Sequence, residues 1–312
     1  MLLGVIYGIA ACMIWGFAYI APLILSNYDP LHIALVRYVI FGCLSLGLAV
    51  TQWKEFSHYS AADWKRALAL GIIGNLFYFW LLAEACQLAG APVAGAFTAM
   101  IPITVALIGN LRAAQRGEKA LAWRSLLPPL ALVLIGMVCL NGTEFVYLVE
   151  SGRQTQSNFW LGVLAAIVSL AVWTWYPICH GEWLMEHPQR SPQAWSTAQG
   201  VTLLPASFFG LIGYILSGNS AGDIFGPTPL LFLAIAFFLG IVTSWVGIWL
   251  WSLMSRRLPT ALGGQMIVFE TLFAVIYTHL WRSECPTPLM LIGMAFLLIG
   301  IVGALRAFNT PR

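Results

Sequence analysis

Apolar residues run through this chain in ten long stretches, separated by short polar segments. Each stretch is close to the roughly 20 residues that an α-helix needs to cross a hydrocarbon core about 30 Å thick. The predicted spans are residues 2–25, 31–51, 67–89, 92–112, 125–141, 159–179, 196–216, 229–253, 260–281 and 288–306. Backbone groups in lipid must be hydrogen-bonded within their own segment, so we predict helices. The alternating pattern of a membrane β-barrel is missing.

Composition supports the same interpretation. The 312 residues are 60% hydrophobic and 9% charged, with a mean hydropathy of +0.84. A soluble domain of this length needs far more polar surface. We therefore predict an integral membrane protein whose spans leave no room for a soluble domain. The first apolar run lacks a basic flank and is too long for a secretory signal peptide.

The basic residues predict the orientation of the chain. If the N-terminus is cytoplasmic, only Arg153 and Arg282 lie in outer loops, and Arg37 lies within a span. The other basic residues then lie at the cytoplasmic side: Lys54, Lys65, Arg66, Arg112, Arg116, Lys119, Arg124, Arg190, Arg256, Arg257, Arg306 and Arg312. This bias favours cytoplasmic termini. The net charge of +3 is explained by it, and no basic stretch with interleaved aromatics indicates nucleic-acid binding.

The two halves of the chain echo each other, which predicts a duplication. Leu-Gly-Val precedes Trp15 and Trp173 at the same spacing. Asp29-Pro30 opens the second span, and Ser191-Pro192 opens the seventh. On this alignment Arg37 falls opposite Gln199. We predict an all-α membrane protein of ten helices, with a first five-helix half at 1–147 and a second at 148–312. Because five is odd, the halves insert with inverted topology, which is typical of transporters. The polar segment 142–158 is the predicted connector.

Several short motifs occur in an order that belongs to a known family. They are Ala11-x-x-x-Trp15-Gly16, Arg37, Ala83-x-Ala85, Pro102, Gly117-Glu118 and Gly136-Met137-Val138. With these, the chain resembles the drug/metabolite transporter superfamily in its EamA-type ten-helix branch, most of all the bacterial aromatic amino acid exporters. Where typical members carry a Pro in the ninth span, this chain has Glu270. The resemblance implies a multi-pass protein of the bacterial inner membrane that exports amino acids or small amphiphiles.

Aromatic and hydroxyl side chains near the middle of spans are candidates for a central substrate cavity. The candidates are Trp15, Tyr19, Tyr78, Trp173, Tyr176, Ser244 and Trp245. Residues four apart share a helix face, which puts Trp15 with Tyr19. Such a cavity suits an aromatic or apolar side chain through stacking and weak hydrogen bonds. It suits organic cations equally well through cation–π attraction, so the aromatics alone do not choose a substrate.

Arg37 and Glu84 stand alone within apolar stretches, and intramembrane charges are functional candidates by default. Arg37 lies about six residues into its span, roughly 9 Å below the outer interface. Glu84 has a similar depth in the third span. Three roles are open for Arg37: an ion pair with Glu84, snorkelling to the outer headgroups, or binding of a substrate carboxylate.

Glu270 lies ten residues into the ninth span, near the bilayer midplane, with no cationic partner evident at that depth. Proton coupling, contact with a substrate amino group and a hydrogen bond to a neighbouring helix all remain open for it. Gln265, a little nearer the cytoplasm on the same span, is a further candidate for the cavity.

These residues predict an inner-membrane transporter that exports aromatic and other neutral amino acids by alternating access. Efflux of cationic drugs or other amphiphilic metabolites is the second hypothesis. An intramembrane enzyme is the weakest, because neither Ser169 nor Ser244 has a His at comparable depth to act as a base. No two His residues have metal-ligand spacing, so we expect no metal and no cofactor. The driving force is not determined by the sequence.

Overall fold

The computed structural model describes residues 1–89, 94, 97–98, 100–117, 122–151, 156–218, 225–283 and 285–309. Every regular element among these residues is helical, and helices cover the predicted apolar stretches wherever they are described. Six of the described helices are long and apolar enough to cross a membrane: Leu2–Ile24, Pro30–Thr51, Ala61–Leu88, Phe159–Glu186, Pro192–Leu216 and Pro229–Ser255. The protein is therefore an all-helical, multi-span membrane protein.

The elements follow one another in a simple order. They are α1 (Leu2–Ile24), α2 (Pro30–Thr51), α3 (Trp53–Phe56), α4 (Ala61–Gly71), η1 (Ile72–Phe77), α5 (Tyr78–Leu88), α7 (Ile101–Gln115), α8 (Trp123–Ser151), α9 (Gln156–Glu186), α10 (Pro192–Leu216), α11 (Pro229–Phe237), η2 (Phe238–Val246), α12 (Gly247–Ser255), α13 (Thr260–Met266), α14 (Val268–Arg282) and α15 (Pro288–Asn309). The predicted span 92–112 lies partly outside the described residues and is helical from Ile101 onward.

Local chemistry explains where several helices begin. The Asp29 carboxylate accepts hydrogen bonds from the backbone of Leu31 and His32, and Pro30 occupies the first turn of α2. Ser191 caps α10 in the same way, again followed by a proline. Side-chain oxygens at these positions satisfy backbone N–H groups that have no partner within the helix, and a proline in the first turn costs no hydrogen bond.

Two boundaries differ from the sequence-based predictions. The third span begins at Ala61 rather than at residue 67, because Ser60 and Asp63 form a reciprocal capping box that starts α4 within a polar segment. The predicted boundary between the halves at 147/148 falls inside α8, which continues to Ser151 before α9 begins at Gln156. Much of the predicted connector 142–158 is thus helical, since polar residues extend an existing helix where they do not cap it.

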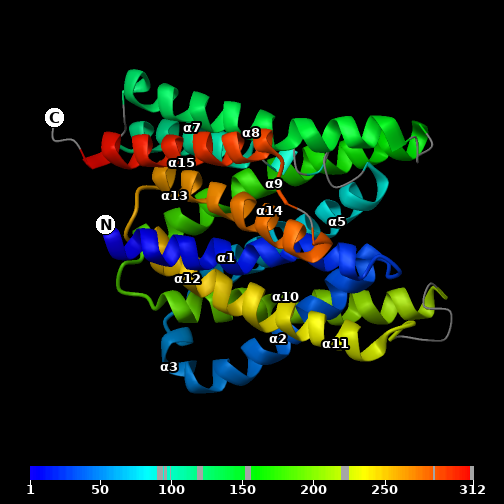
Figure 1. Ribbon diagram of the computed structural model, residues 1–312. Coiled ribbons are helices and arrows are strands. Elements are labelled where there is room, and N and C mark those ends of the chain that lie inside the picture. The colour runs from blue at the N-terminus through cyan, green and yellow to red at the C-terminus, as the bar shows by residue number, and fades with distance from the viewer. Residues whose placement is uncertain are drawn as a thin grey trace.

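Helices far apart in the sequence pack against one another. α2 packs against α10, and α8 against α15. α1 packs against α12 and α14, while α9 packs against α5 and α7. In Figure 1, α8 and α15 lie along one side of the bundle, α2, α10 and α11 along the other, and α1 and α14 between them. The centre of the bundle is therefore enclosed by helices from both halves.

Two π-helical segments interrupt long helices at matching places. η1 joins α4 to α5 in the third predicted span, and η2 joins α11 to α12 in the eighth. A π-helix is wider than an α-helix and leaves backbone carbonyls free for other partners, and such segments are frequent at functional sites. Both segments border the central cavity described below.

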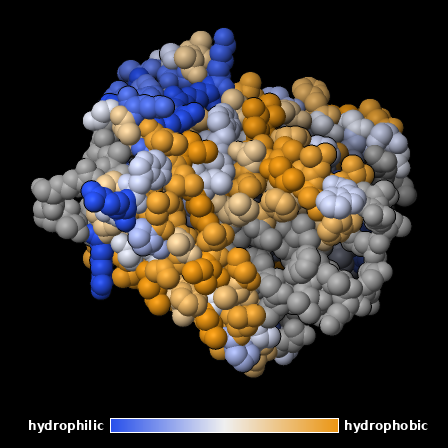
Figure 2. Space-filling model, turned by 90° about the horizontal axis from the view of Figure 1, so that it is seen from above, coloured by the Kyte–Doolittle hydropathy of each residue, from blue (hydrophilic) through white to orange (hydrophobic). Residues whose placement is uncertain are grey.

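The outer surface is apolar over the length of the bundle. Figure 2 shows a face dominated by hydrophobic residues, with hydrophilic residues gathered toward one end. Leu127 and Val138 on α8 and Leu291 and Ile299 on α15 are each more than half exposed. The beginning of α1 and the end of α15 lie at the same end of the bundle (Figure 1).

Candidate functional site

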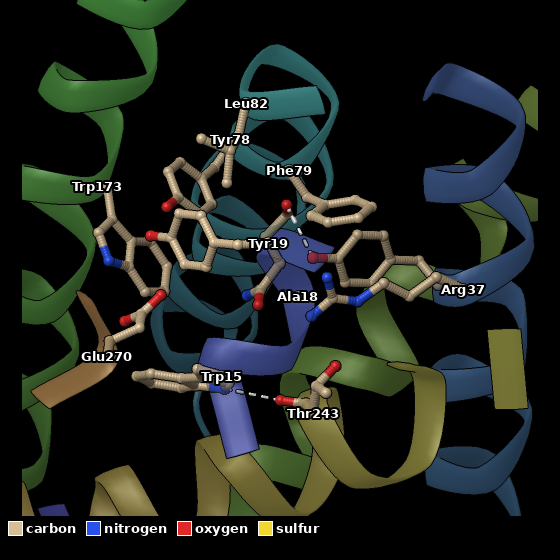
Figure 3. Close-up of a pocket in the computed structure, with 12 residues that line it drawn as sticks. Trp15, Ala18, Tyr19, Arg37, Tyr78, Phe79, Leu82, Trp173, Thr243 and Glu270 are labelled. Carbon is tan, nitrogen blue, oxygen red and sulfur yellow. Dashed lines mark hydrogen bonds between the residues drawn. The ribbon is translucent and has the colours of Figure 1, made fainter. Parts of the chain in front are cut away.

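A narrow cavity lies at the centre of the bundle, with a volume of about 30 Å³. Its walls come from α1, α2, η1, α5, α9, η2 and α14. The lining residues, drawn in Figure 3, are Trp15, Ala18, Tyr19, Arg37, Tyr38, Asn75, Tyr78, Phe79, Leu82, Trp173, Thr243 and Glu270. Six of the predicted site residues are among them: Trp15, Tyr19, Arg37, Tyr78, Trp173 and Glu270. The structure thus brings together side chains from distant parts of the chain.

The Arg37 side chain lines the cavity, and a hydrogen bond from Nε holds one edge of its guanidinium group. Its Nε atom donates to Ser244 Oγ at 3.0 Å, and its Cζ atom lies 4.4 Å from the centre of the Phe79 ring. The two Nη atoms point toward the middle of the cavity (Figure 3). The side chain is therefore anchored by one nitrogen while a pair of N–H donors faces the open space.

The predicted ion pair between Arg37 and Glu84 is not formed among the described residues. Glu84 instead accepts a hydrogen bond from Trp80 Nε1, one turn earlier on its own helix, at 3.0 Å. Glu84 is half-buried and does not line the cavity, whereas Arg37 is buried. The two side chains therefore have different surroundings, Arg37 beside Ser244 and Glu84 beside Trp80.

Glu270 faces Arg37 from the opposite side of the cavity (Figure 3). Its carboxylate interacts with the hydroxyl of Tyr19, and its Oε2 atom is buried with no hydrogen-bond partner in the described structure. Two more buried polar atoms of the lining lack partners there: the Tyr78 hydroxyl and Trp173 Nε1. Buried polar groups are normally hydrogen-bonded, so these three atoms indicate that the cavity receives a polar ligand or water.

On one side of the cavity the aromatic rings stack against each other and form an aromatic wall. Trp173 lies between Tyr78, at 4.4 Å and 12°, and Tyr176, at 4.8 Å and 4°. Trp15 meets the edge of Trp173 at 5.6 Å, and its Nε1 donates to the carbonyl of Thr243 at 2.7 Å. Both faces of the Trp173 indole are covered, so it presents its edge and its N–H to the cavity.

Four predicted site residues lie outside the cavity lining. Tyr176 donates to Gln199 Oε1 at 3.1 Å, behind Trp173, and Trp245 donates to the hydroxyl of Thr197 at 3.1 Å. Ser244 is buried against Arg37 rather than open to the cavity. Gln265 is fully buried, and both polar atoms of its amide lack partners in the described structure.

The structure adds lining residues that sequence reasoning missed. Tyr38 and Asn75 are two of these residues, and the Tyr38 hydroxyl donates a hydrogen bond to the Asn75 carbonyl at 2.9 Å. Asn75 was recognisable as an amide in the middle of an apolar span, whereas nothing in the sequence marks Ala18, Phe79 or Leu82. No cluster of three His, Cys, Asp or Glu side chains that suits a metal occurs in the described part of the chain.

Comparison with known proteins identifies a family, a relative and a similar fold. Residues 2–121 match the model of the EamA-like transporter family. The chain is 35% identical over 314 residues to the inner membrane protein YtfF of Escherichia coli (strain K12), a match that covers 98% of this chain and 96% of the relative. A protein whose solved structure is titled only "Crystal structure of protein" superposes with a TM-score of 0.70 at 17% identity, covering 98% of this chain and 99% of that one. The last match speaks for the fold alone.

Proposed function

Since the chain belongs to the EamA-like transporter family, within the drug/metabolite transporter superfamily, we propose that it exports neutral amino acids across the bacterial inner membrane by alternating access. The family consists of membrane transporters, so the protein is not an enzyme. The finer statement, that the cargo is an amino acid, rests on the central cavity.

The observation that carries the proposal is the placement of Arg37 and Glu270 on opposite sides of one cavity. A planar guanidinium with free Nη donors suits a carboxylate, and an unpartnered carboxylate oxygen suits an ammonium group. An α-amino acid carries both groups on one carbon atom. The free donors of Tyr78 and Trp173 add hydrogen bonds for the carboxylate or for a polar side chain. Aromatic substrates remain in the proposed range, held by the apolar edges of the wall rather than by stacking.

Efflux of cationic drugs is the competing function, and Arg37 weighs against it. A buried guanidinium repels a ligand that carries only positive charge, since such interactions are weakly screened away from water. Glu270 in turn weighs against simple organic anions. A zwitterion satisfies both residues, which is why the amino acid is preferred to either singly charged class.

The same proposal includes ten spans arranged as two inverted halves, about 1–147 and 148–312, with cytoplasmic termini. Support comes from the corresponding contacts α2 with α10 and α8 with α15, and from a π segment in both the third and the eighth span. The beginning of α1 and the end of α15 lie at one end of the bundle, as an even number of spans requires. In inverted repeats the substrate site lies near the midplane between the halves, and the cavity is lined by residues from both proposed halves.

The test uses purified protein in proteoliposomes and three related probes: L-tryptophan, tryptamine, which lacks the carboxylate, and indole-3-propionate, which lacks the ammonium group. We expect transport of tryptophan and much weaker transport of both analogues. Arg37→Gln is expected to remove the preference for tryptophan over tryptamine, and Glu270→Gln the preference over indole-3-propionate. Efficient transport of tryptamine by the wild-type protein, with no transport of tryptophan or of L-leucine, would establish the cationic alternative instead.

Glu270→Gln also separates the two functional roles of Glu270. If the residue couples transport to protons, the variant binds tryptophan normally but transport no longer responds to a pH gradient, because an amide releases no proton. If it binds the ammonium group, tryptophan binding weakens with and without the gradient. Wild-type behaviour in both measurements would remove Glu270 from the site.

A further inference from the structure

The two π segments share a short sequence and a side-chain hydrogen bond to the backbone. The same three residues occur at the start of each: Leu70-Gly71-Ile72 runs into η1, which begins at Ile72, and Leu239-Gly240-Ile241 follows the first residue of η2. In each segment a polar side chain returns to the carbonyl five residues earlier. Asn75 Nδ2 donates to the Leu70 carbonyl at 3.0 Å, and Ser244 Oγ donates to the Leu239 carbonyl at 2.9 Å. The Leu239 carbonyl also accepts from Thr243 Oγ1 at 2.6 Å.

The hydrogen bond to the Leu239 carbonyl determines what Ser244 offers to Arg37. A serine hydroxyl has one proton and two lone pairs. Because the proton of Ser244 is directed to the Leu239 carbonyl, the lone pairs are left to accept from Arg37 Nε at 3.0 Å. The Ser244 hydroxyl is thus a defined acceptor rather than a freely rotating group, and Ser244 is only 1% exposed.

The backbone brings Ser244 to this position through Gly240. A Cβ atom on Gly240 would lie 2.8 Å from the carbonyl oxygen of Arg37 and 2.7 Å from Ile40 Cγ2. Only glycine permits this approach of η2 to α2. The close contact places the π segment beside Arg37, so the register of η2 sets where the Ser244 hydroxyl meets the guanidinium.

The remaining surroundings of Arg37 do not fix the direction of its guanidinium. The cation lies over the rings of Phe79, at 4.4 Å, and Tyr38, at 5.0 Å. Such contacts attract the charge but tolerate rotation within the plane of the guanidinium group. No acidic side chain forms a salt bridge with Arg37 among the described residues. The Nε–Ser244 hydrogen bond is the directional contact that the structure shows for this group.

We propose that Ser244 is a positioning residue for substrate selection: it holds Arg37 by Nε so that the two Nη donors face the cavity and meet a substrate carboxylate. The inference rests on the proposed function, because it requires Arg37 to bind that carboxylate. It replaces the sequence-based expectation that Ser244 touches the substrate. Two-point recognition of a carboxylate depends on the angle of the guanidinium plane, so loss of the Ser244 hydroxyl should weaken carboxylate recognition and leave the rest of the site intact.

The test compares L-tryptophan with tryptamine as competitors against radiolabelled L-tryptophan, on detergent-purified full-length protein. We expect Ser244→Ala to weaken tryptophan binding about tenfold and tryptamine binding less than twofold. Ser244→Thr retains a hydroxyl and should recover most of the affinity for tryptophan. Ser207→Ala is the matched control, because Ser207 is equally buried but donates only to carbonyls of its own helix α10. It should change neither ligand.

The outcomes separate this inference from the proposed function. A wild-type protein that binds tryptamine as tightly as tryptophan overturns both, because Arg37 then recognises no carboxylate. If the wild-type protein prefers tryptophan but Ser244→Ala weakens both ligands equally, Ser244 has a structural role only. Unchanged tryptophan binding in Ser244→Ala also overturns the positioning role while the proposed function stands. In either of these two cases Arg37→Gln still abolishes the preference.

Discussion

An ion-pair cluster joins three of the helices that support the cavity, and its central residue is Glu182 on α9. The Glu182 carboxylate lies 3.1 Å from Arg112 Nη1 and 2.9 Å from Arg116 Nη2, both at the end of α7, and 3.8 Å from Arg66 on α4. Its side chain is only 6% exposed. α4 continues through η1 into α5, which carries Tyr78, and α9 carries Trp173, so the cluster fixes the helices whose rings stack in the cavity wall.

We predict that Glu182→Gln lowers the free energy of unfolding by about 2 kcal/mol. Exposed ion pairs contribute roughly 0.2–1 kcal/mol each, and breaking a fully buried pair costs roughly 3–5 kcal/mol. The three arginine side chains are 30–43% exposed, so water partly compensates them and the upper range does not apply. Three contacts discounted in this way give the intermediate value. Glutamine keeps the size of the side chain, so packing is little changed.

The assay is unfolding by SDS in mixed micelles, followed by the fluorescence of the 14 tryptophans. Glu186→Gln is the matched control, because Glu186 contacts Arg66 and Arg116 but its side chain is 46% exposed. We expect the control to lose less than about 1 kcal/mol. Added salt should also reduce the difference between Glu182→Gln and wild type, since salt screens the lost interaction. Equal losses in the two variants, or a loss insensitive to salt, would refute the electrostatic explanation.

Three further predictions follow from the contacts in and around the cavity. Gly240→Ala should reduce transport strongly, because its Cβ atom would meet the Arg37 carbonyl at 2.8 Å, whereas Gly47→Ala, whose Cβ atom meets nothing within 4 Å, should transport normally. Tyr38→Phe removes a buried hydrogen bond to the Asn75 carbonyl in η1 and should cost about 1 kcal/mol of stability in the same SDS titration. A reporter fused to the C-terminus should report the cytoplasm. A periplasmic signal would contradict the ten-span, inverted arrangement.

The class of fold was predictable because membrane helices obey few rules. A span must be long, apolar and helical, so most of the described helices begin and end within a few residues of the bounds that the hydropathy pattern predicts. The exceptions have local causes: polar capping at Ser60 and Asp63 starts α4 early, and α8 continues past the predicted boundary at 147/148. Capping and helix extension use the same polar residues, and only the three-dimensional surroundings decide between them.

The cavity was predictable in part, through charge and depth. Arg37 and Glu270 stood out because an isolated charge within a membrane span is energetically costly and is therefore a functional candidate. Both line the cavity. Depth did not give direction, however: Glu84 does not line the cavity, and no ion pair joins it to Arg37 among the described residues. The π segments explain much of the remaining error. An extra residue per turn rotates everything that follows on the helix, and no residue pattern marked η2, so Ser244 was expected in the cavity instead of behind Arg37.

In the proposed arrangement of two inverted halves, the halves share a scaffold but only one of them supplies the proposed carboxylate subsite. Gly71 approaches the carbonyl of Gln199 as Gly240 approaches the carbonyl of Arg37, so the two polar residues hold corresponding places. Gln199 is uncharged and accepts a hydrogen bond from Tyr176 behind the aromatic wall, whereas Arg37 faces the cavity. An exact two-fold site would offer two cations to one small substrate and leave one of them without a counter-charge at membrane depth, which is costly. The asymmetry therefore suits the proposed site, in which one zwitterion binds in one orientation, and the proposed symmetry of the scaffold would serve the opening of both sides.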